Sequence, residues 1–311
     1  MAASAATRWP STLAWRAREA PRGFPRNARV WHRPCGTLLA MSAGHVITHL
    51  ETVGAGKASK ADGSATPGSP ALEDATPQVG VITLNRPEKR NALNAAIATA
   101  VAEAVRAYTS AGVRAILIRG EGPVFCAGAD LSGGVYADDF WSAMEDMLSA
   151  IQTTPVPVIA DIHGPAVGAG CQIALACDLR AFADEGACWV PVAEHGFALD
   201  LWTHARAREL MGGALARNVF LAGARVGAEQ ARATGFSVVL DDATPSATAL
   251  AHRVARQAPL SMEHSKCVFN SPDMHADAEL QQMMVDVWAS EDVQEARRAR
   301  AEKRAPQFRG R

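Results

Sequence analysis

Two glycine-rich segments carry the residue types best suited to hold a developing negative charge. The first covers residues 125–131 (FCAGADL) and comes shortly after a predicted strand at 113–119. The second covers residues 163–172 (HGPAVGAGCQ), follows a predicted strand at 157–162 and opens a helix. A helix N-terminus has free N–H groups and a partial positive charge, and small side chains let a ligand approach that backbone closely. Two such N–H groups, one from each loop, could therefore hold one oxyanion.

The second segment has an alternative interpretation as a dinucleotide-binding loop. Its glycine spacing does not fit GxGxxG, and no acidic residue follows at the end of a next strand. Taken alone, each segment could also be a tight turn between a strand and a helix. The pair is more specific than either segment and predicts a site for a carbonyl oxygen.

The elements that must position these loops alternate along the chain. The β-branched residues at 45–53 and 79–85 predict two strands, and the Gly-, Ser-, Ala- and Pro-rich stretch 54–78 predicts a flexible hairpin insertion between them. Strands that alternate with helices then predict a buried parallel sheet followed by a helical layer. Further strands are expected at 113–119, 157–162 and 178–183, and helices at 94–109 (with Asn94 as N-cap), 137–152, 168–177, 203–212, 226–234, 246–257, 260–269 and 276–303.

Composition excludes several classes of protein. The chain has 311 residues, 48% of them hydrophobic, which is enough to bury one large core. A net charge of −1 does not indicate a nucleic-acid or membrane-surface partner, and no apolar run is long enough for a transmembrane helix. The six cysteines are scattered, without CxxC pairs, so we expect buried thiols and no metal site.

The first forty residues differ from the rest, with seven arginines and a single acid, Glu19. This composition is typical of a mitochondrial transit peptide, but it also fits an over-extended start with translation from Met41. We therefore expect residues 1–40 to lie outside the fold, 41–245 to form the core with the insertion, and 246–311 to form a C-terminal helical region. A cytoplasmic location follows unless the transit peptide is real.

Three motifs in order resemble the enoyl-CoA hydratase/isomerase, or crotonase, superfamily. They are LNRPEKRNAL (84–93), FCAGADL (125–131) and HGPAVGAGCQIALACDLR (163–180), and the similarity runs from about Met41 to residues 302–308. The resemblance implies an α/β fold, a spiral of ββα units with a C-terminal helical trimerisation region. It also implies a homotrimer or hexamer that binds a coenzyme A thioester as ligand and needs no other cofactor.

The resemblance also implies roles for particular residues. The oxyanion donors would be the backbone N–H groups of Ala129 and Ala169. The loop 86–93 would run beside the adenosine and phosphates of CoA, and Phe308, which in some relatives comes from a neighbouring subunit, would close the pocket. The residues expected to bind CoA are Arg86, Lys89, Arg90, Ala92, Ala127 and Phe308. The basic residues among them could also belong to a solvated turn.

The chain departs from the family at both acidic positions of a hydratase, which are occupied here by Gln172 and Val192. Glutamine can hydrogen-bond a water but cannot accept its proton, and valine can do neither. Each general acid or base contributes roughly 10²–10⁴ in rate, so little hydratase activity is expected.

Two other acids could replace them. Some isomerases and a dehalogenase of the superfamily carry a working aspartate at the offset of Asp200, although this residue could equally be the N-cap of the next helix. Glu194 lies two residues after Val192, on the same face if the segment is extended. An acyl pocket could be lined by Trp189, Phe197, Leu199 and Trp202, which could also be core residues.

Three hypotheses follow. The first is a protein that binds acyl-CoA without hydrating it, in fatty-acid or other lipid metabolism. The second is an active isomerase, hydratase or acyl-CoA hydrolase that relies on Asp200 or Glu194. The third is a structural subunit with no affinity for CoA.

Overall fold

The computed structural model describes residues 42, 43, 45–54, 76–132 and 138–311. The extension 1–40 and most of the expected insertion lie outside these residues. Among the helices described, none is long and apolar enough to cross a membrane. Within the same residues, no group of three or more His, Cys, Asp or Glu side chains could hold a metal ion.

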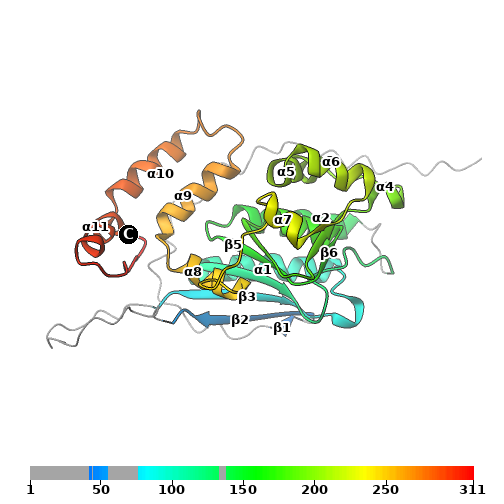
Figure 1. The fold of residues 1–311 in the computed structure, drawn as a ribbon, viewed down its shortest axis with the longest axis horizontal. Helices are drawn as coiled ribbons and strands as arrows, with labels where there is room; N and C mark the ends of the chain where they lie inside the picture. Colours follow the sequence, from blue (N-terminus) through cyan, green and yellow to red (C-terminus); the bar gives the residue numbers. More distant parts are fainter. Residues whose placement is uncertain (1–41, 44, 55–75, 133–137) are drawn as a thin grey trace, which may run out of the picture.

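The larger sheet has six strands in the order β1-β2-β3-β4-β5-β7. Figure 1 shows its first strands, β1 and β2, along one side of the molecule. The first three strands pair antiparallel, and β3, β4, β5 and β7 pair in parallel. The predicted hairpin and the predicted parallel sheet are therefore both present. The strands are β1 (Ser42–Ala43), β2 (Val46–Thr52), β3 (Gln78–Leu84), β4 (Ala115–Gly120), β5 (Val158–Ile162) and β7 (Leu179–Phe182).

Helices cover both faces of the parallel sheet, so its strands are buried on both sides. Alternate residues of β4 show this: Ile116 and Ile118 belong to one hydrophobic cluster, whereas Ala115 and Leu117 belong to another. The first cluster includes α1 (Ala95–Ala111), α2 (Asp138–Thr153) and α3 (Ala169–Ala176). The second includes α8 (Ala247–Ala255).

A second, three-stranded sheet consists of β6 (Pro165–Val167), β8 (Ala187–Trp189) and β9 (Val226–Gly227). None of these strands was expected, because two or three residues are too few to show a strand pattern. The helices that follow are α4 (Val192–His195), α5 (Leu201–Met211), α6 (Gly213–Ala222) and α7 (Ala228–Ala233). The sequence interpretation missed α4 and α6.

The C-terminal helices are α9 (Pro259–Asn270), α10 (Ala278–Ala289) and α11 (Glu291–Ala301), and they stand beside the sheet as a separate arm (Figure 1). The single helix expected at 276–303 is wrong. Ser290 adopts an extended conformation, with ψ 156°, and its hydroxyl caps α11 by accepting the N–H of Val293 at 3.4 Å. A serine in this role ends one helix and begins another.

The cysteines also differ from expectation. Cys171 of α3 and Cys188 of β8 form a disulfide, with their Cα atoms 5.6 Å apart. The expectation of free thiols therefore fails for this pair, which becomes adjacent only through the fold. Cys126, Cys177 and Cys267 are free and buried, and Cys35 lies outside the described residues.

Candidate oxyanion site

Two backbone hydrogen bonds, from the residues that flank Ala129, join the first glycine-rich loop to Leu93. The N–H of Leu93 donates to the carbonyl oxygen of Gly128 at 2.8 Å, and the N–H of Asp130 donates to the carbonyl oxygen of Leu93 at 2.7 Å. Successive peptide groups of an extended segment face opposite sides, so the N–H of Ala129 points away from Leu93. Gly128 permits this course because its φ is +99°.

The second loop ends at the N-terminus of α3. Gly168 has a φ of +53° and occupies the N-cap position, and its own N–H donates to the carbonyl oxygen of Trp189 at 3.0 Å. Ala169 is the first residue of the helix, so its N–H has no acceptor within α3 and lies at the positive end of the helix dipole.

The two loops meet through their backbones. The N–H of Val167 donates to the carbonyl oxygen of Cys126 at 2.9 Å. A Cβ atom on Gly128 would lie 2.9 Å from the carbonyl oxygen of Val167 and 3.6 Å from the nitrogen of Ala169. Only glycine lets the two backbones approach so closely. Among the hydrogen bonds of the described residues, none has the N–H of Ala129 or Ala169 as its donor.

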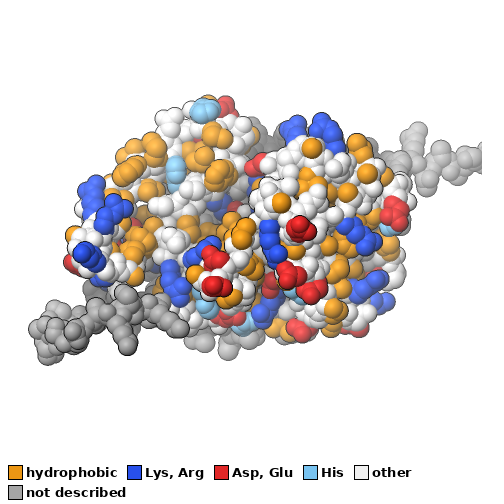
Figure 2. Space-filling model, viewed as in Figure 1, with side chains coloured by type: hydrophobic (Ala, Val, Ile, Leu, Met, Phe, Trp, Pro, Cys, Tyr) orange, Lys and Arg blue, Asp and Glu red, His pale blue; other side chains and the backbone are white. Residues whose placement is uncertain are grey.

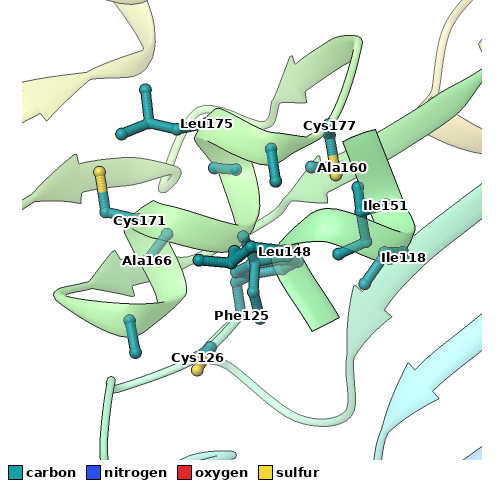
Figure 3. Close-up of a cluster of buried hydrophobic side chains, with 14 of the residues drawn as sticks. Ile118, Phe125, Cys126, Leu148, Ile151, Ala160, Ala166, Cys171, Leu175 and Cys177 are labelled. Carbon is teal, nitrogen blue, oxygen red and sulfur yellow. The ribbon is translucent and has the colours of Figure 1, made fainter. Parts of the chain in front are cut away.

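A rigid core supports both loops. Phe125 and Cys126 of the first loop lie in one buried cluster with Ala166 and Cys171 of the second (Figure 3). Leu148 of α2 belongs to the same cluster. Dense packing of this kind holds the two amides in place without help from a ligand.

The basic loop before Leu93 has an unusual turn. Arg90 and Asn91 have φ values of +52° and +55°. The buried Asn91 side chain stabilises the turn, because it accepts the N–H of Arg86 at 2.9 Å and donates to the carbonyl oxygens of Glu121 (2.9 Å) and Val124 (2.7 Å). The main chain also couples this turn to the first glycine-rich loop, since the N–H of Ala127 donates to the carbonyl oxygen of Arg90 at 2.9 Å.

The three cations expected to bind CoA do not share one environment. The guanidinium of Arg86 is 15% exposed, lies 2.6 Å from the carboxylate of Asp130 and donates to the carbonyl oxygen of Ala92 at 3.3 Å. Hydrogen bonds from Ser132 and from Arg86 lower the pKa of Asp130 to about 2. Lys89 and Arg90 are exposed. Arg86 is thus engaged within the protein, and the other two remain accessible to phosphates.

Gln172, at the first hydratase position, is 3% exposed and held in place by two neighbours. Its Nε2 lies 2.8 Å from Oγ1 of Thr203 and 3.2 Å from Oδ2 of Asp200. Asp200 is the N-cap of α5, since its Oδ1 accepts the N–H of Thr203 at 2.8 Å and its Oδ2 accepts the Thr203 hydroxyl at 2.8 Å. Asp200 therefore caps α5, as one of the two interpretations of this residue predicted.

Val192, at the second hydratase position, is 7% exposed and begins the short helix α4. The extended course assumed for this segment is wrong, because residues 192–195 are helical. Two residues along a helix turn about 200°, so exposed Glu194 does not share the face of Val192.

The four side chains expected to line an acyl pocket have different surroundings. Leu199 and Trp202 pack against the hydrophobic core, and Trp202 donates its Nε1–H to Oε1 of Gln152 at 2.9 Å. Phe197 is 41% exposed. The ring of Trp189 lies 4.4 Å beneath the guanidinium of Arg225.

Phe308 lies near the amino-terminal ends of the parallel strands. Its carbonyl oxygen accepts a hydrogen bond from Arg114, which immediately precedes β4, at 3.2 Å. It also lines a cleft of about 750 Å³ with Pro157 and Asp178, which precede β5 and β7. Ala129 and Ala169 follow the carboxyl ends of these parallel strands, so Phe308 is remote from them within one chain.

Comparison with known proteins shows the family. Residues 74–311 match the enoyl-CoA hydratase/isomerase family. The chain belongs to this family. It is 39% identical over 231 residues to "Probable enoyl-CoA hydratase echA6" of Mycobacterium bovis, covering 74% of this chain and 95% of that protein. The protein of the same name from Mycobacterium leprae is 40% identical over 238 residues, covering 75% and 96%.

Solved structures of the family confirm the crotonase fold. The structure of an enoyl-CoA hydratase/carnithine racemase from Magnetospirillum magneticum has a TM-score of 0.67 and 29% identity, covering 75% of this chain and 92% of that one. An enoyl-CoA hydratase from Mycobacterium tuberculosis has a TM-score of 0.63 and 30% identity, covering 75% and 96%.

Two features of the site were missed in the sequence. Thr203 was not expected there, although the spacing of Asp200 and Thr203 is that of an N-cap and its N3 residue and could have indicated the contact. The pair of Arg86 and Asp130 spans 44 positions and has no local signal.

Proposed function

We propose that this protein binds the thioester carbonyl of an acyl-CoA with the N–H groups of Ala129 and Ala169 and does not hydrate the acyl chain. The two free amides, brought together at the N-terminus of α3, support the binding half of this proposal. They suit a carbonyl oxygen because both are donors fixed by the fold, that of Ala129 in an extended loop and that of Ala169 at a helix N-terminus. Exposed Lys89 and Arg90 would meet the CoA phosphates.

The chemistry and hydrogen bonds of Gln172 support the second part of the proposal, that the acyl chain is not hydrated. Hydration requires a group that takes a proton from water and a group that delivers one to the α-carbon. The Gln172 amide can do neither, and both of its hydrogens are engaged by Asp200 and Thr203. The side chain of Val192 has no polar atom. The loss of two such groups, each contributing roughly 10²–10⁴ in rate, leaves a binding site.

The direct test mixes the protein with short- and long-chain 2-enoyl-CoA and identifies bound and free thioesters by mass spectrometry. Retention of unchanged thioester is the expected result. Accumulation of a hydrated, isomerised or hydrolysed product would refute the proposal. Loss of that product in Asp200→Asn would then support an Asp200-dependent enzyme, and the exposed Glu194 would be tested next.

The binding mode can be tested through the backbone itself. Ala169→Pro removes one donor at the first position of a helix, where proline is well tolerated. The matched control is Ala278→Pro at the first position of α10. We expect acyl-CoA to bind about threefold to tenfold more weakly to Ala169→Pro, which is the range for one hydrogen bond, and unchanged to the control. Equal affinity in both variants would exclude Ala169 as a donor.

The proposal includes a homotrimer. Large apolar side chains are exposed on α9 and α10, namely Phe269 (70% exposed), Met284 (47%), Val285 (54%) and Trp288 (69%). Figure 2 shows hydrophobic side chains over this arm. Exposed apolar surface of this kind marks interaction sites. Light scattering on the wild type and on Trp288→Glu should give a trimer and a smaller species, respectively, whereas a monomeric wild type would exclude the trimer.

A further inference from the structure

The disulfide lies next to one of the two proposed donors. Cys171 is the third residue of α3, two positions after Ala169, and Cys188 is the middle residue of β8. The residue after Cys188 is Trp189, whose carbonyl oxygen accepts the N–H of Gly168 at 3.0 Å. Two consecutive residues of β8 therefore hold residues 168 and 171, which lie on either side of Ala169.

The disulfide supplements short strands at this point. The hydrophobic cluster packs α3 against the first glycine-rich loop, but the attachment of α3 to the small sheet is a separate matter. In that sheet β8 pairs with β6 through three residue pairs and with β9 through two. Gly168 has no side chain to pack, and a Cβ atom added to it would meet nothing within 4 Å. A covalent link between α3 and β8 therefore has a large share in fixing the backbone around Ala169.

Reduction of the disulfide would act on the donor through the packing. Cys171 and Cys188 are both 0% exposed and belong to the same hydrophobic cluster. Once the bond is broken, the two sulfur atoms must move apart to van der Waals contact, and a close-packed interior transmits such a displacement to its neighbours. Ala169 is less than one helical turn from Cys171, so its N–H is among the first groups displaced.

We propose that Cys171 and Cys188 form a redox switch of the oxyanion site, whose disulfide form binds acyl thioesters more tightly than its dithiol form. This inference rests on the proposed binding of acyl-CoA by Ala129 and Ala169. Closing the switch removes one proton and one electron from each thiol and joins the two sulfur atoms. A small disulfide such as oxidised glutathione takes up both electrons and both protons and becomes two thiols; reopening is the reverse reaction.

The bound thioester and the disulfide should also protect each other. If the disulfide form binds acyl-CoA more tightly by some factor, then saturating acyl-CoA must shift the thiol–disulfide equilibrium towards the disulfide by the same factor. Neither sulfur atom is exposed, so exchange with a small thiol requires β8 to open first. A ligand held by the N–H of Ala169 stabilises the closed arrangement and opposes that opening.

The test titrates octanoyl-CoA into the full chain in both redox states by isothermal titration calorimetry. Oxidised glutathione prepares one state and tris(2-carboxyethyl)phosphine the other, and mass spectrometry after alkylation checks the bond between residues 171 and 188. We expect about threefold to tenfold tighter binding to the oxidised state, the range for one hydrogen bond. The double variant Cys171→Ala, Cys188→Ala should bind equally under both conditions. Cys267→Ala, which removes a free buried thiol, should respond like the wild type.

Hydrogen exchange, followed by NMR, tests the switch without any ligand. The N–H of Gly168, which donates to Trp189, should exchange about tenfold faster in the reduced state. The N–H of Ile116, which donates to the carbonyl oxygen of Pro157 at 2.9 Å in the larger sheet, should exchange equally in both states. Equal acceleration at both amides would make the disulfide a general staple of the fold and would overturn the switch.

Three further results would overturn the inference alone. They are free thiols at 171 and 188 after oxidation, equal affinity for octanoyl-CoA in the two states, and a response to reductant that persists in the double variant. The comparison within the wild type decides even if the double variant does not fold. Absence of octanoyl-CoA binding in both states would instead refute the proposed function, and the exchange of Gly168 would still show whether reduction loosens the backbone beside Ala169.

Discussion

The guanidinium of Arg86 lies 2.6 Å from the carboxylate of Asp130, next in sequence to the proposed donor Ala129. Both side chains are largely buried, at 15% and 11% exposure. Together with the two backbone bonds from Leu93, this ion pair fixes the direction of the Ala129 N–H. We therefore infer that Arg86, a residue expected to bind CoA phosphates, positions the proposed donor instead.

Asp130→Asn should weaken the polarisation of a bound thioester. The chromophore of cinnamoyl-CoA shifts to longer wavelength when its carbonyl accepts strong hydrogen bonds, so the shift reports the donors directly. We expect a smaller shift in Asp130→Asn, and also in Arg86→Met, than in wild type. Arg86→Lys, which keeps the charge, should recover part of it. An unchanged shift in Asp130→Asn would show that the pair does not position Ala129.

The same pair predicts a dependence of stability on pH. The pKa of Asp130 is lowered from 3.8 to about 2, first by its hydrogen bonds with Ser132 and then by Arg86. A depressed carboxylate pKa stabilises the fold at pH values above the unfolded pKa, and this contribution is lost as the pH falls from about 4 towards 2. In urea unfolding across this range, the free energy of unfolding should fall more steeply with decreasing pH in wild type than in Asp130→Asn. Parallel curves would contradict the assignment.

Restoring a glutamate at position 172 should not restore hydration by itself. Gln172→Glu would place a second carboxylate beside Asp200, where Nε2 now lies 3.2 Å from Oδ2. We expect the free energy of unfolding to fall by about 1–3 kcal/mol at neutral pH, as for a buried polar pair that has lost its donor. Adding Asp200→Asn should restore it. Thermal unfolding of the single and double variants checks this. Hydratase activity would be sought only after Val192→Glu is combined with the double variant. A single Gln172→Glu variant as stable as wild type would show that the contact between Gln172 and Asp200 does not stabilise the fold.

A buried ion pair joins the C-terminal arm to the sheet. Nζ of Lys266 in α9 lies 2.7 Å from Asp178 and also donates to the carbonyl oxygens of Ile151 (3.1 Å) and Val156 (3.0 Å). Lys266→Met leaves a largely buried carboxylate unpaired, and we expect a loss of about 3–5 kcal/mol in denaturant unfolding. Lys266→Met combined with Asp178→Asn should recover part of that loss, because the unpaired charge is gone. A double variant as unstable as the single one would assign the loss to packing instead.

Local patterns were enough to predict most elements but few of the contacts between them. Asn94 was identified as an N-cap because its type and its place before an apolar helix are sufficient, and its side chain accepts the N–H of Ile97 at 2.9 Å. Ser290 was overlooked because no glycine or proline interrupts the helix-forming residues on either side of it, at 278–289 and 291–301. The disulfide of Cys171 and Cys188 depends on the pairing of β6 with β8, and these strands are too short to recognise.

For the proposed site, the sequence indicated main-chain positions but not the contacts between side chains. The donors at 129 and 169 were placed from motif positions, and the backbone geometry there is suited to the expected role. Side-chain partners such as Thr203 for Gln172, or Asp130 for Arg86, come from distant segments and require the fold. Phe308 was assigned to the CoA site from its motif position alone, and in this chain it lies near the residues that precede β4, β5 and β7.

Because the proposed donors are peptide N–H groups at positions 129 and 169, alanine scanning cannot detect them. Both positions already carry alanine, and replacing either by another ordinary residue leaves the donor in place. A mutational survey of side chains would therefore report the surroundings of the site and miss its centre. Substitutions that alter the backbone, by proline or by an ester in place of the amide, are needed to map it.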